Sequence, residues 1–279
     1  MAQNNDSKPS YTLYVYVTRY SSWGARVQTV LEYFKIPYKV QYFNYENPAL
    51  APPADLAGGL LPVLDVSPGP GAPSSTAAGE SLRIADSLSI CEFLAEQHPD
   101  KALWPRDPQL RALARTAAAQ MHSGFMALRN AYPSNFVARF TGPGIPFDDA
   151  IARDVRQLVE LWSNLRVATK KRLAQLGEED AGFLCGGFSV ADAFFWPVLW
   201  RFRTYNVPLT WISGEGLEWM ATMWSDPALK AQGNEYFRQA EDPQTKISAY
   251  DDLFENKYDV KSERFTKDWA FKGDRVSVI

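Results

Sequence analysis

The sequence predicts a small mixed α/β domain followed by an all-helical domain. Over residues 11–100, strand-like and helix-like patterns alternate in the order of a βαβ unit followed by two strands and a helix. Beyond Trp104 and Pro105, long stretches rich in Ala, Leu and Arg carry apolar residues at helical spacing. A chain of 279 residues is long enough to bury two such cores.

The elements of the first domain follow in order along the chain. Residues 11–17 form an aromatic and β-branched strand, and the helix after it places Val27, Val30, Leu31 and Phe34 on one face. Residues 38–43 alternate as a half-buried strand, whereas 48–57 show no period. Pro62 opens a short apolar strand, and residues 82–84 form another. A helix runs from Asp86 to His98 and Pro99.

The second domain is expected to contain long helices only. One spans residues 107–132, another starts at Asp148, and a very apolar one covers residues 193–202. Ser189 and Asp192 have the spacing of a capping box that opens the last of these, so both are assigned to folding.

These patterns divide the chain into five segments. We predict a flexible N-terminus at 1–10, an α/β domain at 11–100, a linker at 101–108, a helical domain at 109–242 and a C-terminal extension at 243–279. The extension is charged and less periodic, so it packs on the outside or is partly mobile. Residues 67–79, rich in Pro and Gly, read as an exposed loop, with a lid or partner surface as alternatives to a tolerated insertion.

Composition excludes several classes of function. A formal net charge of −3 gives no attraction to nucleic acid or anionic membranes. No apolar run approaches the ~20 residues of a membrane span, and the polar N-terminus is no secretory signal. Two cysteines favour a reducing, cytoplasmic location, and two histidines make no structural zinc site, so no metal is expected.

The junction between the first strand and its helix is a candidate anion site. A helix start has unpaired N–H groups and a partial positive charge, and Ser21 or Ser22 adds a hydroxyl donor there. The alternative is an ordinary serine N-cap without a ligand.

Four stretches carry a resemblance to the cytosolic glutathione transferases. Residues 21–27 (SSWGARV) resemble the serine signature of the zeta class and of bacterial Tyr-Ser-Ser-Trp-type members. Residues 61–64 (LPVL) resemble the family's cis-proline strand start, 86–90 (DSLSI) its acidic-Ser pair, and 187–192 (GFSVAD) its helical folding motif. The resemblance implies a thioredoxin-like α/β domain plus an all-α domain, glutathione as cosubstrate or cofactor, and a homodimer.

The resemblance also assigns roles to residues of the first domain. The anion becomes the glutathione thiolate, with Ser22 favoured as its hydroxyl donor and with Ser21 and Trp23 lining the site. Arg26 reaches a carboxylate of the peptide or of an acidic substrate. Leu61 pairs its backbone with the cysteinyl part, Pro62 is cis, and Asp86 and Ser87 hold the γ-glutamyl end, although an ordinary Asp/Ser cap explains that pair equally.

The electrophile site is expected between the two domains. Two further stretches, 121–125 and 201–205, resemble the helical domain of bacterial members. The candidate lining residues are Met121, His122, Phe125, Arg129, Arg201, Arg203 and Tyr205. For His122, a role as a hydrogen-bonded residue of the core or of the cavity lining is favoured over a role as general base. The alternative for the arginines is that their side chains are simply exposed to solvent. Cys91 and Cys185 read as structural.

The function that follows is addition of the glutathione thiolate to a small-molecule electrophile. Release of the adduct gives conjugation, whereas rotation and expulsion of the thiol gives cis–trans isomerisation, which the zeta-like motif favours. A non-catalytic binding or interaction module is the alternative, and a glutaredoxin-like reductase lacks its cysteine. The Pro- and aromatic-rich composition hints at specialised metabolism.

Overall fold

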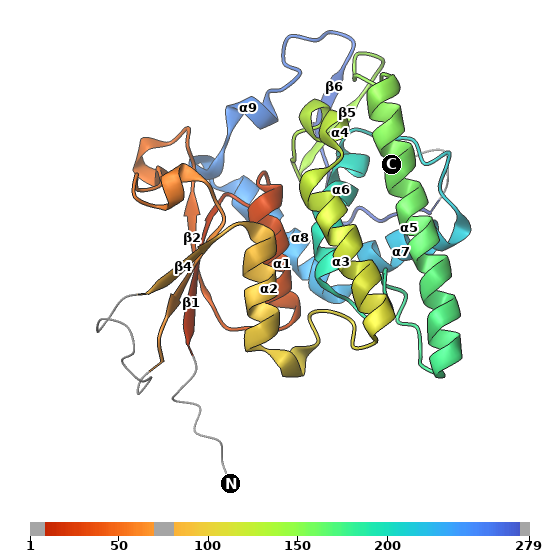
Figure 1. The fold of residues 1–279 in the computed structure, drawn as a ribbon. Coiled ribbons are helices and arrows are strands. Elements are labelled where there is room, and N and C mark those ends of the chain that lie inside the picture. The colour runs from red at the N-terminus through yellow and green to blue at the C-terminus, as the bar shows by residue number, and fades with distance from the viewer. Residues whose placement is uncertain (1–8, 70–80, 274–279) are drawn as a thin grey trace.

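The computed structural model describes residues 9–69 and 81–273, and it confirms the predicted fold class (Figure 1). A sheet with two helices on its inner side packs against a larger helical domain, and the C-terminal segment runs back across both (Figure 1). Most of the 67–79 loop and the outermost residues of both termini lie outside the described residues.

The α/β domain has the predicted order of elements. Strands β1 (Ser10–Tyr16), β2 (Lys39–Phe43), β3 (Val63–Ser67) and β4 (Leu82–Ala85) form one sheet in the order β2-β1-β3-β4. β1 and β2 are parallel, whereas β3 is antiparallel to both β1 and β4. Helices α1 (Ser22–Tyr33) and α2 (Ser87–Gln97) lie between this sheet and the helical domain (Figure 1). The segments without a clear period contain only short 3-10 turns, at Pro48–Leu50 and Ala57–Gly59.

Gly24 allows the first turn of α1 to lie directly on β1. A Cβ atom at this position would meet Val15 Cγ1 at 2.8 Å, closer than carbon atoms pack. We therefore expect Gly24→Ala to lower the free energy of unfolding by about 1–3 kcal/mol, the usual effect of overpacking. Urea denaturation measures this, with Gly187→Ala as the control, since no heavy atom lies within 4 Å of a Cβ there.

The helical domain is built around one buried helix. Its elements are α3 (Pro108–Ser123), α4 (Met126–Ala131), α5 (Asp149–Leu176), α6 (Val190–Thr204), α7 (Gly214–Ser225) and α8 (Pro227–Glu241). Every residue of α6 is buried, as its apolar sequence predicts, and Pro197 is accommodated inside it. The capping box of Ser189 and Asp192 opens α6 as predicted.

The prediction of one helix over residues 107–132 is wrong. The chain leaves helical geometry at Gly124, which is extended, and at Phe125, which has a φ of 59°. A Cβ at Gly124 would lie 2.7 Å from the Gln120 carbonyl oxygen, so glycine is required where α3 ends. The stretch therefore forms two helices, α3 and the short α4, which are separated by Gly124 and Phe125.

The C-terminal extension is more structured than its composition indicates. Its strand β6 (Lys261–Arg264) pairs with β5 (Ala138–Thr141), which lies inside the segment 109–242. The expectation of helices only in that segment is therefore wrong at β5, because its pairing partner comes from the extension. Before β6, the short α9 (Ser248–Asp251) lies beside the loop that follows β2 (Figure 1). The Glu46 carboxylate accepts hydrogen bonds from the backbone N–H groups of Ser248 and Ala249, at 2.6 and 3.1 Å. The extension thus ties the two domains together.

Candidate active site

A cavity of about 770 Å³ lies where the two domains and the C-terminal extension meet. Three parts of the chain contribute to its wall: the α/β domain, α4 with the segment after it and α6, and the start of the extension. The lining residues are Tyr16, Tyr20, Ser21, Ser22, Trp23, Tyr45, Gly59, Leu60, Leu61, Pro62, Ala85, Asp86, Ser87, Arg129, Asn130, Pro133, Ser134, Arg201, Ile247 and Tyr250. Most residues that the sequence assigns to the tripeptide are therefore brought together.

The two serines occupy different positions at the start of α1. Ser21 is the N-cap, and its Oγ accepts a hydrogen bond from the Gly24 N–H at 3.4 Å. Ser22 is the first helical residue and only 6% exposed, and its Oγ accepts a hydrogen bond from Arg201 Nη2 at 3.4 Å. Both oxygens already accept, so both hydroxyl protons are available to a ligand in the cavity.

The Leu61-Pro62 peptide bond is cis, as the resemblance implies. The strand starts one residue later than predicted, since Val63 is the first residue of β3. Pro62 cannot donate to a sheet ladder, which places it naturally just before the strand. Leu61 and Pro62 both line the cavity.

Asp86 and Ser87 open α2 at the same cavity. Asp86 has a φ of 79°, and its Oδ1 accepts from the N–H groups of Leu88 and Ser89 at 2.8 and 3.0 Å. Its Oδ2 lies 3.1 Å from His122 Nε2. Ser87 is 1% exposed, and its Oγ has no hydrogen-bond partner among the described residues. A buried hydroxyl without a partner is costly, so Ser87 is poised to bind a polar ligand group.

Arg26 does not reach the cavity. It is fully buried, with its guanidinium carbon 4.6 Å from the centre of the Trp23 ring and 4.8 Å from that of Phe194. None of its three side-chain nitrogens has a hydrogen-bond partner in the described structure. Burial, and then the charges of Arg129 and Arg201, hold the pKa of Arg26 well below its usual value. Its position favours ring stacking over carboxylate binding.

The helical-domain candidates divide into two groups. Arg129 and Arg201 line the cavity, whereas Met121, His122, Phe125, Arg203 and Tyr205 do not. Met121 is fully buried in the core, and the Tyr205 ring stacks on Tyr132 at 4.6 Å. His122 contacts Asp86 and the Trp23 ring, and burial lowers the pKa of its imidazole. His122 thus contacts two residues that line the cavity without lining it itself.

An aromatic wall was not anticipated from the sequence. Tyr20 and Tyr250 have ring centres 5.4 Å apart, and those of Tyr16 and Tyr45 are 5.9 Å apart. Tyr250 and Ile247 belong to the extension, where the Ile247 N–H donates to the Tyr20 hydroxyl at 3.3 Å. No local pattern marks these residues, because they meet only through tertiary contacts.

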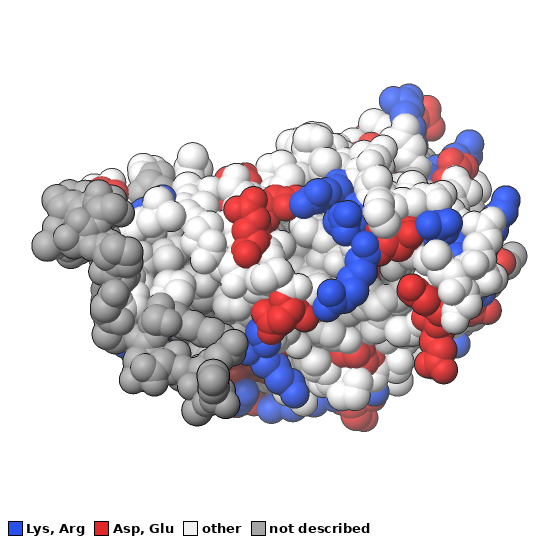
Figure 2. Space-filling model, turned by 60° about the horizontal axis from the view of Figure 1, so that its bottom comes forward, with Lys and Arg blue, Asp and Glu red and all other residues white. Residues whose placement is uncertain are grey.

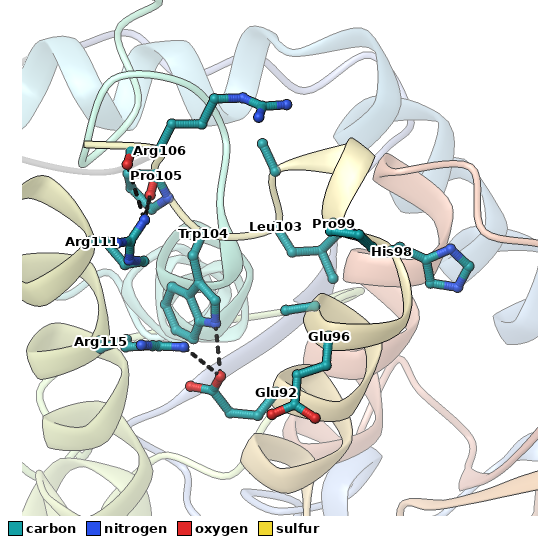
Figure 3. Close-up of a pocket in the computed structure, with 12 residues that line it drawn as sticks. Glu92, Glu96, His98, Pro99, Leu103, Trp104, Pro105, Arg106, Arg111 and Arg115 are labelled. Carbon is teal, nitrogen blue, oxygen red and sulfur yellow. Dashed lines mark hydrogen bonds and ion pairs between the residues drawn. The ribbon is translucent and has the colours of Figure 1, made fainter. Parts of the chain in front are cut away.

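A second cavity, of about 340 Å³, lies at the other end of α2, beside α3 (Figure 3). Arg115 Nη2 and Trp104 Nε1 both donate to Glu92 Oε2, at 2.9 and 3.2 Å. Arg111 donates to the carbonyls of Pro105 and Arg106. Arg106 donates to the Asp100 carbonyl, so neither it nor Arg111 is paired with a carboxylate of the residues that the structure describes. Figure 2 shows Lys and Arg side chains grouped on this face, with Asp and Glu side chains nearby.

Other kinds of site find little support in the described residues. Among them, no cluster of three His, Cys, Asp or Glu side chains is arranged to hold a metal ion. No helix in the described ranges has the length and apolar character needed to cross a membrane. Cys91 and Cys185 are buried free thiols, and burial raises the pKa of both.

Fold and site together define a thioredoxin-like domain with a helical partner and, between them, a cavity lined by aromatic, apolar and polar side chains. The family model for the N-terminal domain of glutathione S-transferases matches residues 20–97, and that for the C-terminal domain matches 147–222. Together they cover more than half of the chain, which therefore belongs to the glutathione S-transferase family of glutathione-dependent enzymes.

Several known proteins are similar to the chain over most of its length. Pyrimidodiazepine synthase of Drosophila melanogaster is 29% identical over 237 residues, which are 82% of this chain and 84% of that protein. Maleylacetoacetate isomerase of Dictyostelium discoideum is 26% identical over 71% of this chain and 82% of its own. The maleylacetoacetate isomerase structure from Anaeromyxobacter dehalogenans, with bound dicarboxyethyl glutathione and citrate, shares the fold with a TM-score of 0.52 and 18% identity, covering 86% and 97% of the two chains.

Proposed function

We propose that this protein binds glutathione in the 770 Å³ cavity and activates its thiol for attack on an electrophilic small molecule. The observation that carries the proposal is the meeting, in one cavity, of the serine pair at the start of α1, the cis-Pro62 turn and the unpartnered Ser87 hydroxyl. These groups suit the thiol, the cysteinyl backbone and the γ-glutamyl carboxylate respectively.

The chemistry needs a stabilised thiolate. A free thiol has a pKa near 8.5, so about a few per cent is ionised at pH 7. A hydroxyl donor and the helix N-terminus both favour the charged form. Ser22 is our preferred donor, because Arg201 occupies its oxygen and leaves its proton for the sulfur, whereas Ser21 also serves as the cap of α1.

Addition followed by elimination, with net cis–trans isomerisation, is the favoured outcome. Support comes from the zeta-like serine motif and from a relative named as an isomerase. Arg129 and Arg201 give the cavity positive charge, which suits an electrophile whose carbonyl becomes negatively charged when sulfur adds. Conjugation shares every step up to the adduct.

A time course with a cis-configured unsaturated ketone separates the two outcomes. Isomerisation predicts that the trans ketone accumulates while the amount of free glutathione stays constant. Consumption of one glutathione per molecule of product shows conjugation, which would contradict the isomerase assignment and leave glutathione activation intact. Enzyme-free samples measure the background addition.

A non-catalytic binding or interaction module is the second candidate. It predicts that glutathione binds as a thiol and that no electrophile is turned over. The serine pair in the cavity favours catalysis over this alternative.

The proposal also covers the oligomeric state of the protein, its location in the cell and its metabolic role. A homodimer is the usual assembly of the family, and light scattering of the purified protein tests it. The two free cysteines suit a reducing, cytoplasmic location. A role in specialised metabolism fits the aromatic wall, which suits a conjugated electrophile.

A further inference from the structure

Arg201 is held in one orientation at the cavity wall. Its Nε donates to the Tyr132 carbonyl at 2.8 Å, and its Nη1 donates to the Pro197 carbonyl at 3.1 Å. The remaining nitrogen, Nη2, donates to Ser22 Oγ at 3.4 Å. The residue is 5% exposed and lines the cavity. Two neutral carbonyls thus aim a guanidinium at the start of α1.

This guanidinium has no counter-ion among the described residues. No carboxylate of residues 9–69 or 81–273 forms an ion pair with Arg201, nor with Arg129, whose Nη1 donates to the carbonyls of His122 and Gly124. Burial, and then the charge of Arg129, lower the pKa of Arg201 to about 10, so it stays a cation at neutral pH. A buried, uncompensated cation is costly unless an anion joins it. The cavity therefore favours a ligand that brings negative charge next to Arg201.

We propose that Arg201, on the helical domain, is a positioning residue that orients the Ser22 hydroxyl toward sulfur and stabilises the glutathione thiolate by its charge. The inference rests on the proposed function. The Arg201 N–H donates to the Ser22 oxygen, so the Ser22 O–H points elsewhere and can donate to sulfur. The thiol proton leaves to solvent, and Arg201 remains protonated throughout.

The consequence is that the helical domain takes part in activating glutathione. α1 supplies the serine and the helix N-terminus, and α6 supplies the permanent charge. Arg201 and Ser22 are 179 residues apart in the sequence, so activation depends on how the domains are docked.

The test measures the thiol pKa of bound glutathione by its ultraviolet thiolate absorbance in Arg201→Gln and Arg201→Lys. We expect Arg201→Gln to raise this pKa by about one unit, which lowers the thiolate fraction at pH 7 about threefold from a wild-type pKa near 6.5, and Arg201→Lys to retain part of the effect. In a protein that already carries Ser22→Ala, Arg201→Gln should raise the thiol pKa by less than it does in the wild type, since the two groups act together.

Arg203→Gln is the matched control. Arg203 is equally buried in α6, but it stacks on aromatic rings, with Phe136 at 4.2 Å and Phe265 at 4.4 Å, and does not line the cavity. It should lose stability without changing the thiol pKa. An unchanged thiol pKa in a folded Arg201→Gln protein overturns the inference. Absence of any thiolate in the wild-type protein overturns the proposed function instead.

Discussion

Asp192→Ala is expected to lower the free energy of unfolding by about 3–5 kcal/mol, since each buried donor left unpaired costs about 1–3 kcal/mol. The fully buried Asp192 carboxylate accepts from the N–H groups of Leu184 and Ser189, from Ser189 Oγ and from Trp219 Nε1, at 2.9–3.1 Å. It joins the turn before α6 to α6 and α7, and so holds the core of the helical domain.

Urea denaturation with Asp148→Ala as the control measures this effect. Asp148 caps α5 through the N–H groups of Ala150 and Ile151, but it lies at the surface. Loss of an exposed cap costs about 1 kcal/mol. Equal losses in the two variants would contradict the role assigned to Asp192.

The same carboxyl gives unfolding a pH dependence of known sign. Burial raises the pKa of Asp192 from 3.8 to about 6. Between these values the folded protein holds a proton that the unfolded chain has released, so the contribution of Asp192 to stability falls as pH rises. Asp192→Asn should lack this slope when its unfolding free energy is compared with that of the wild type from pH 4 to pH 6 (about the interval between the two pKa values).

Ser22→Ala is expected to raise the thiol pKa of bound glutathione by about one to two units, which removes about 70–95% of the thiolate at pH 7 if the wild-type pKa is about 6.5. The hydroxyl is lost, and Arg201 loses the group through which it acts. At a fixed pH below the new pKa, the rate with an electrophile should fall in proportion to the fraction of bound glutathione that is thiolate, because the thiolate is the nucleophile.

Ser21→Ala is the informative comparison for Ser22→Ala. Ser21 caps α1 through the Gly24 N–H, so its loss should cost stability of about 0.5–1 kcal/mol and a smaller part of the thiolate. If Ser21→Ala removes more thiolate than Ser22→Ala, the N-cap hydroxyl is the one that contacts sulfur. That result would contradict the preference for Ser22.

Local patterns predicted the fold well because the elements have strong signals. The alternation in β1 and the apolar face of α1 are both readable from the chain, and the capping box at Ser189 marks the start of α6. The break in the helix at Gly124 and Phe125 was not predicted, because residues that favour helices continue on both sides of it. The strand β6 escaped because its partner, β5, is more than a hundred residues away.

Sequence motifs identify some of the residues that line the cavity, whereas tertiary contacts bring the others there. Ser87 and Pro62 sit in recognisable motifs, and both line the cavity. Tyr250 and Ile247 have no motif, and only the docking of the extension brings them there. Arg26 has a motif, but its side chain stacks between rings, and sequence spacing does not reveal such an orientation.

The ultraviolet titration of glutathione bound to the wild-type protein tests the central claim most directly. Stabilisation by Ser22, Arg201 and the start of α1 predicts a thiol pKa about two units below the free value of about 8.5, so that most bound glutathione is thiolate at neutral pH. A bound thiol that titrates at or above the free value would contradict the account, because glutathione would then be bound without being activated.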